Sequence, residues 1–131
     1  MTGSFEQAVK ECERLLKIRG RILPVTLYST HLCAELKDGV VVEEEVNVRA
    51  VGKAPIARVF LKHDPTETSS ECIDAILRAD LITIGPGSLY TTVIACLLVE
   101  GIASAIRNSP AVCVYLANTT TQPGQTDGLS L

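Results

Sequence analysis

The sequence predicts an α/β fold with a parallel sheet, and three observations lead to that prediction. Residues 81–84 and 111–117 are short apolar runs without alternation, as in strands that helices cover on both faces. A helical pattern at 89–108 separates them and is long enough for a right-handed crossover. A glycine-rich turn at 85–88 directly follows the first run. We therefore expect two neighbouring parallel strands, with the connecting helix packed on one face of their sheet.

The first half of the chain is predicted to hold one helix and a β-rich insertion. Apolar residues recur at spacings of three and four over residues 4–18, which predicts an amphipathic helix capped by Thr2 or Ser4. The insertion spans residues 22–62. Its candidate strands are 22–28, 32–36, 40–42 and 56–61.

Turn residues and charged residues add detail to the prediction for this insertion. Asp38-Gly39 lies between two β-rich runs, which predicts a hairpin. Pro24 cannot donate to a ladder, so the strand around it is expected at an edge or a bulge. The acidic run 43–45 is interpreted as a solvated strand end.

The second half, residues 66–131, is predicted to be a strand–helix–strand unit that binds a ligand. Ahead of its first strand, a helix capped by Ser69 or Ser70 extends to Arg78. Glu100-Gly101 divides or kinks the helical region 89–108. We expect 1–131 to be one partial domain. Two parallel strands leave their edges open, which predicts missing strands or completion by another chain, such as a homo-oligomer.

Composition and charge exclude several classes of protein. The chain has 131 residues, 47% of them hydrophobic but only 4% aromatic, so its core must be aliphatic. A net charge of −3 gives no electrostatic footprint for nucleic acid. The longest apolar run, 93–99, is too short to span a bilayer, so no membrane insertion is expected.

Cysteine usage and the polar N-terminus predict a cytoplasmic location. Five cysteines without CxxC spacing, mostly in apolar contexts, suggest reduced and buried thiols rather than a zinc site. The early residues Glu6 and Lys10 argue against a signal peptide.

Two polar segments are expected to form a binding site. The segments 85–92 and 118–128 each follow a parallel strand, and ligands of such sheets bind beyond the carboxyl ends of the strands. Glycines there permit close backbone approach, and helix N-terminal amides attract phosphates. The candidate binding residues are Gly85, Gly87, Ser88, Tyr90, Thr91, Asn118, Gln122, Thr126 and Asp127.

Each of these residues also has a purely structural interpretation. The glycines could serve turn geometry alone, and Tyr90 could be a half-buried core residue. Asn118 could satisfy loop backbone instead of a ligand. Asp127 could hold Mg²⁺, accept a ribose hydroxyl, or stabilise its own turn. No Ser–His–Asp or Cys–His arrangement is legible, and His31 and His63 are read as surface or strand residues.

Both polar segments resemble one protein family. Ile84-Gly85-Pro86-Gly87-Ser88-Leu89-Tyr90-Thr91-Thr92 and Asn118-Thr119-Thr120-Thr121-Gln122-Pro123-Gly124-Gln125-Thr126-Asp127-Gly128 look like motifs of the gluconeogenesis factor family, relatives of 2-phospho-L-lactate transferase. The segments 19–24 and 37–39 fit the same pattern, so the resemblance covers essentially the entire chain.

The resemblance implies an incomplete Rossmann-like, mostly parallel sheet with flanking helices. It implies a longer chain with a GGGTG turn near its N-terminus, and this chain lacks that turn. It also implies a regulator of bacterial carbon metabolism and cell shape that binds a nucleotide-sugar or dinucleotide, with Mg²⁺ as a possible companion of the nucleotide. The alternative is an enzyme that transfers a phospholactyl group to a deazaflavin. Leu129 stands where the regulatory branch commonly carries an aromatic residue, which puts base stacking in doubt.

Overall fold

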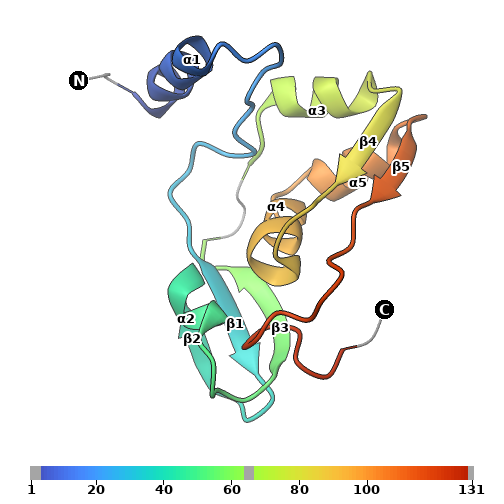
Figure 1. Cartoon of the computed structure of the whole chain (residues 1–131). Coiled ribbons are helices and arrows are strands. Elements are labelled where there is room, and N and C mark those ends of the chain that lie inside the picture. The colour runs from blue at the N-terminus through green and yellow to red at the C-terminus, as the bar shows by residue number, and fades with distance from the viewer. Residues whose placement is uncertain (1–3, 64–66, 130–131) are drawn as a thin grey trace.

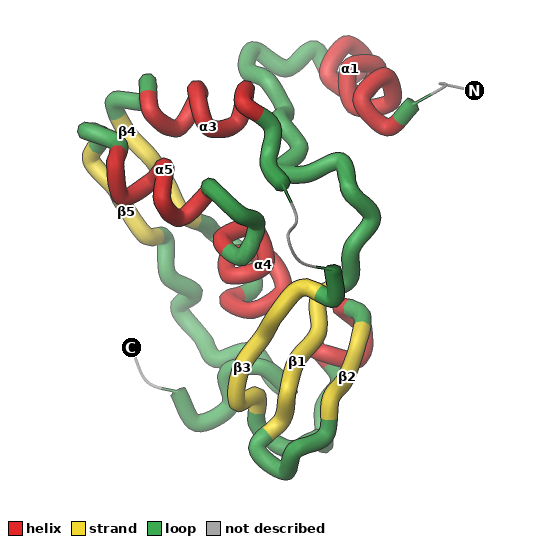
Figure 2. Tube along the Cα trace, turned by 180° about the vertical axis from the view of Figure 1, so that it is seen from behind, coloured by secondary structure: helices red, strands yellow, loops and turns green. Residues whose placement is uncertain are grey.

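The computed structural model describes residues 4–63 and 67–129. Within them, a three-stranded antiparallel sheet and a two-stranded parallel sheet lie at opposite ends of the molecule, with the helix α4 between them (Figures 1 and 2). The chain therefore has the mixed α/β fold, with a β-hairpin-containing insertion, that the sequence predicts.

The antiparallel sheet forms from the predicted insertion. Its strands are β1 (Leu32–Leu36), β2 (Val41–Glu43) and β3 (Ile56–Leu61), in the order β2-β1-β3. In the hairpin Cys33 faces Glu43, and Gly39 takes a positive φ of 85° in the turn. The hairpin and the strand 56–61 are thus confirmed.

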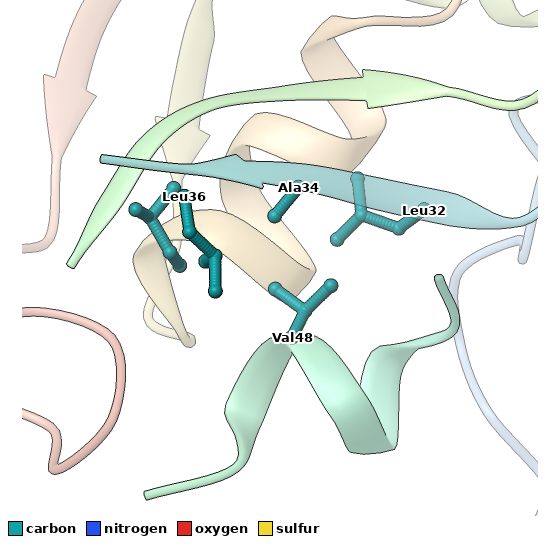
Figure 3. Packing of buried hydrophobic residues seen from close by; sticks show 5 residues of the cluster. Leu32, Ala34, Leu36 and Val48 are labelled. Atoms are coloured by element: carbon teal, nitrogen blue, oxygen red, sulfur yellow. The ribbon is translucent and has the colours of Figure 1, made fainter. Parts of the chain in front are cut away.

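One face of β1 holds the core of this sheet. Leu32, Ala34 and Leu36 alternate along the strand, so their side chains share a face and pack toward Val48 (Figure 3). Val48 belongs to α2 (Glu45–Arg49), a helix that the sequence analysis missed. The prediction for 43–45 was therefore partly wrong, because Glu45 begins a helix whose five residues are too few for a periodic pattern.

The parallel sheet confirms the predicted crossover. β4 (Leu81–Ile84) pairs in parallel with β5 (Val112–Tyr115) along its whole length. The segments between them are the π-helical η1 (Leu89–Ile94), α4 (Ala95–Leu97) and α5 (Ile102–Asn108). Gly101, with φ of 91°, separates α4 from α5 where the sequence placed the break.

A second core joins the helices of this half. Cys72 of α3 (Ser70–Leu77), Val99 and Ile102 are buried together, and Leu23 and Val25 pack against them. Ser69 caps α3 as predicted, accepting a hydrogen bond from the Cys72 amide at 3.2 Å.

The strand predicted at 22–28 is wrong. That segment is irregular, because its apolar side chains pack on the second core while the thiol of Cys72 donates to the Pro24 carbonyl at 3.2 Å. Its backbone pairs with no strand of the described chain, so no ladder forms.

The N-terminal helix α1 (Phe5–Leu16) lies at the periphery (Figure 1). Ser4 caps it by accepting from the Gln7 amide at 3.2 Å, and the other candidate cap, Thr2, lies outside the described residues. The helix buries none of its residues fully, and Phe5, Leu15 and Leu16 of its apolar stripe are exposed.

Two expectations about burial are wrong. The parallel strands are not covered on both faces, since Leu81 is 57% and Val112 66% exposed. All five cysteines are free thiols, but only Cys33 and Cys72 are buried. No helix in the described chain is long and apolar enough to cross a membrane.

Candidate ligand-binding site

The turn after β4 requires glycine twice. Gly85 has φ of 87°, and a Cβ there would lie 2.9 Å from the carbonyl oxygen of Leu116. A Cβ on Gly87 would lie 2.9 Å from Cγ2 of Thr92. Local geometry therefore accounts for both small residues, independently of a ligand.

The helix that follows the turn begins with a wide π-helical turn. The carbonyl oxygen of Ser88 accepts from the amides of Thr92 and Val93, both at 3.0 Å. The amides of Leu89 and Tyr90 precede these bonds and have no acceptor within the helix. They lie close to the carboxyl end of β4.

The polar loop 118–129 returns to this turn. Asn118 donates its side-chain amide to the Gly87 carbonyl oxygen at 2.8 Å, and Gln122 donates to the Ser88 hydroxyl at 3.1 Å. These two bonds join segments more than thirty residues apart in sequence. The predicted meeting of the two polar segments at one sheet edge is confirmed.

Hydrogen bonds within the loop hold its shape. The Gln122 carbonyl oxygen accepts from the Gln125 amide at 3.0 Å and the Thr126 amide at 2.9 Å. The Thr126 hydroxyl accepts from the Gln122 amide at 2.7 Å, and the Asp127 carboxylate accepts from the Gly124 amide at 2.6 Å. Asp127 thus stabilises its own turn, one of the roles that the sequence left open.

The loop is anchored on the antiparallel half of the molecule. A Cβ on Gly124, whose φ is 78°, would lie 2.6 Å from the carbonyl oxygens of both Arg49 and Ala50 at the end of α2. The ammonium of Lys53 donates to the Gly124 carbonyl oxygen. Sequence reasoning assigned no chemistry to the insertion and missed this contact. Pro123-Gly124 signals a turn, but nothing local indicates what that turn touches.

A cavity of about 270 Å³ opens beside the loop. It is lined by Leu89, Tyr115, Asn118, Thr119, Thr120, Thr121, Thr126 and Leu129. The lining combines hydroxyls and an amide with three larger side chains, and it includes no charged group.

Two of the predicted site residues, Asn118 and Thr126, line the cavity. Gly87 is bonded to Asn118 and Gln122 to Thr126, so both are one hydrogen bond from the lining. Ser88 follows one step further, through its bond with Gln122. The sequence analysis did not single out Leu89, Tyr115 or the three successive threonines 119–121, although the threonines fall within its loop.

Tyr90 and Thr91 point elsewhere. Tyr90 packs against the core of the antiparallel sheet, which matches its structural interpretation. The Thr91 hydroxyl is buried and has no hydrogen-bond partner among the described residues. Neither residue lines the cavity. His31 and His63, at the ends of β1 and β3, are exposed.

The fold and the site together define the class of protein to which this chain belongs. A turn and a loop that meet at the carboxyl ends of parallel strands are the arrangement of open α/β proteins. Residues 1–131 match the family model described as 2-phospho-L-lactate transferase CofD. The chain belongs to this family.

Curated relatives carry a different description. A gluconeogenesis factor from Halalkalibacterium halodurans is 44% identical over 128 residues, which cover 98% of this chain and 39% of that protein. The gluconeogenesis factor of Bacillus subtilis is 44% identical, covering 96% of this chain and 39% of its own length. A putative gluconeogenesis factor of Thermotoga maritima is 46% identical. The chain thus spans about 40% of the length of such relatives.

A solved structure shares the fold. The crystal structure of a UPF0052 family member from Bacillus halodurans aligns with a TM-score of 0.89 at 44% identity. The alignment covers 96% of this chain and 40% of that one.

Proposed function

We propose that this chain forms part of a nucleotide-sugar- or dinucleotide-binding regulator of the gluconeogenesis factor type, acting in the cytoplasm on carbon metabolism and cell shape. One observation carries the proposal. The Gly85–Ser88 turn and the 118–129 loop are hydrogen-bonded to each other around a cavity at the carboxyl ends of β4 and β5.

The chemistry of the cavity suits the uncharged part of such a ligand. Hydroxyls of Thr119, Thr120 and Thr121 and the amide oxygen of Asn118 can pair with sugar or base polar groups. Leu129 offers an apolar wall to a ring. Because the lining holds no charge, the phosphates belong outside the cavity, next to the amides of Leu89 and Tyr90 that follow the Gly85–Ser88 turn.

Magnesium enters this proposal only with the ligand. The described residues contain no group of three or more His, Cys, Asp or Glu side chains placed for a metal ion, and the Asp127 carboxylate is engaged by the Gly124 amide. Mg²⁺ commonly binds through substrate phosphates and one or two carboxylates. It would therefore arrive on the phosphates of a nucleotide.

Calorimetric titration with UDP-glucose, UDP and GDP tests the proposal, using this chain and the Bacillus subtilis relative in parallel. We expect saturable binding by both, weaker for this chain, which spans about 40% of the length of its relatives. Leu129→Glu should weaken binding about tenfold or more. The carboxylate of the new glutamate would lose water when the ligand enters the cavity, and it would repel the ligand's phosphates.

The matched control is Leu15→Glu on the exposed face of α1, which should bind as the unaltered chain does. Absence of nucleotide binding by both proteins would overturn the proposal. Unchanged binding by Leu129→Glu would move the ligand away from this cavity.

The second candidate is a transferase, which the description of the matching family model favours. Incubation with a nucleotide-activated phospholactate donor, a deazaflavin acceptor and Mg²⁺ separates the two candidates. Formation of a phospholactyl-deazaflavin would support the transferase, whereas nucleotide binding without product supports the regulator.

A further inference from the structure

Lys53 is the charged side chain that contacts the cavity loop from the other half of the molecule. It lies between α2 and β3, is half-buried, and donates to the Gly124 carbonyl oxygen across 71 residues of sequence. Lys53 does not line the cavity.

The backbone around Gly124 is seated against the same half. The space that a Cβ would need at Gly124 is occupied by the carbonyl oxygens of Arg49 and Ala50. Those carbonyls end α2. At the same place the Lys53 ammonium donates a charge-assisted hydrogen bond to the Gly124 carbonyl oxygen.

The position of Gly124 is transmitted to the cavity through the loop. Gln122 reaches Ser88, and the Gln122 carbonyl oxygen accepts from the amides of Gln125 and Thr126. Thr126 in turn lines the cavity. A shift at Gly124 therefore displaces both the contact with the turn and one wall of the cavity.

We infer that Lys53 is a positioning residue of the ligand site, which it holds in shape through Gly124 without touching the ligand. The inference rests on the proposed function for its binding readout. It also assigns the β-rich insertion a task, since the hairpin and α2 form the support on which the cavity loop is fixed.

The dependence of affinity on the ligand's phosphate charge distinguishes this positioning role from a direct phosphate contact. Lys53→Met, Lys53→Arg and Lys62→Met are titrated with UMP, UDP and UDP-glucose. Lys62 is the matched control, because it pairs with Glu43 on the antiparallel sheet and has no part in the cavity. We expect Lys53→Met to weaken all three ligands about tenfold, by the same factor, as the loss of one charge-assisted hydrogen bond.

Lys53→Arg should remain within about threefold of the unaltered chain, since a guanidinium keeps the charge and its N–H donors. Lys62→Met should bind normally. A loss with Lys53→Met that is larger for UDP than for UMP would show a phosphate contact and overturn the inference. Unchanged affinity with Lys53→Met would overturn it as well.

Amide hydrogen exchange gives a readout that needs no ligand. Lys53→Met should speed exchange at Gln125 and Thr126, whose amides bond to the Gln122 carbonyl oxygen, while β4 and β5 keep their protection. If no nucleotide binds the unaltered chain, the proposed function fails but this measurement still decides the inference. Unchanged exchange in the loop would refute the role of Lys53.

Discussion

The side-chain amide of Asn118 donates to the carbonyl oxygen of Gly87 at 2.8 Å, and this bond joins the end of one parallel strand to the turn after the other. It uses the amide nitrogen and leaves the amide oxygen for the cavity that Asn118 lines. The two roles that the sequence left open for Asn118, backbone satisfaction and ligand contact, are therefore compatible in one side chain.

Replacing Asn118 tests this double role. Asn118→Ala should lower the free energy of unfolding by about 1 kcal/mol, the net value of a typical hydrogen bond, and should also weaken nucleotide binding. Asn118→Asp should cost more, because its carboxylate would face the Gly87 carbonyl, acceptor against acceptor. Denaturant unfolding and calorimetry measure both effects.

Asn108→Ala, at the exposed end of α5, is the control and should change neither quantity. If Asn118→Asp were as stable as the unaltered chain, the bond to Gly87 would have no energetic weight.

Substitutions at Gly87 distinguish its role in the geometry of the turn from a role in ligand binding. In Gly87→Ala the new methyl group would meet Cγ2 of Thr92 at 2.9 Å, so we expect a loss of about 1–3 kcal/mol in stability together with lost nucleotide affinity. The double variant Gly87→Ala, Thr92→Ser removes Cγ2 and should recover part of the stability, since the Cβ of residue 92 remains 3.1 Å from the new methyl group. It should not recover affinity, because the methyl group still stands where phosphate approaches the backbone.

The control is Gly20→Ala, where a Cβ has nothing within 4 Å. Its stability and binding should match those of the unaltered chain. Recovery of affinity as well as stability in the double variant would show that Gly87 serves the turn alone.

The burial of Cys33 makes stability sensitive to alkaline pH. Burial raises the pKa of the Cys33 thiol, the nearby Glu43 carboxylate raises that pKa further, and Lys62 opposes them. The resulting contribution to stability is fully present below the unfolded thiol pKa of about 8.5 and is lost as pH rises through the raised folded pKa. We therefore expect the free energy of unfolding to fall above about pH 8.5 under reducing conditions.

Cys33→Ala should show a shallower alkaline decline in unfolding experiments between pH 7 and 10, whereas Cys12→Ala, at an exposed thiol, should keep the slope of the unaltered chain. Equal slopes for Cys33→Ala and the unaltered chain would refute this assignment.

Local patterns were sufficient for much of the fold and for the place of the site. The apolar runs at 81–84 and 111–117 predicted parallel strands, and Asp38-Gly39 predicted the hairpin. The meeting of the two polar segments followed from strand direction, because the carboxyl ends of neighbouring parallel strands lie at one edge.

What the sequence could not supply depends on contacts between distant segments. The bond from Lys53 to Gly124 arises where the two halves of the molecule pack together. No local sequence pattern around either residue indicates this contact. The segment 22–28 has the composition of a strand, but its side chains pack on helices instead. Exposure of Leu81 and Val112 likewise depends on which elements lie beside the sheet, which their apolar character does not reveal.

The exposed parallel sheet predicts self-association of this chain. Leu81 and Val112 are 57% and 66% exposed, and each of β4 and β5 has one strand neighbour within the described structure. Unpaired strand edges with apolar side chains are templates for further pairing, and charged residues, especially lysine, blunt them. Sedimentation should therefore show a concentration-dependent shift toward dimers or larger species, and Val112→Lys should reduce that shift. Val46→Lys on α2, which replaces a valine that is 77% exposed outside this sheet, should associate as the unaltered chain does. A monomer at all concentrations, or equal effects of the two lysines, would show that the open sheet does not drive association.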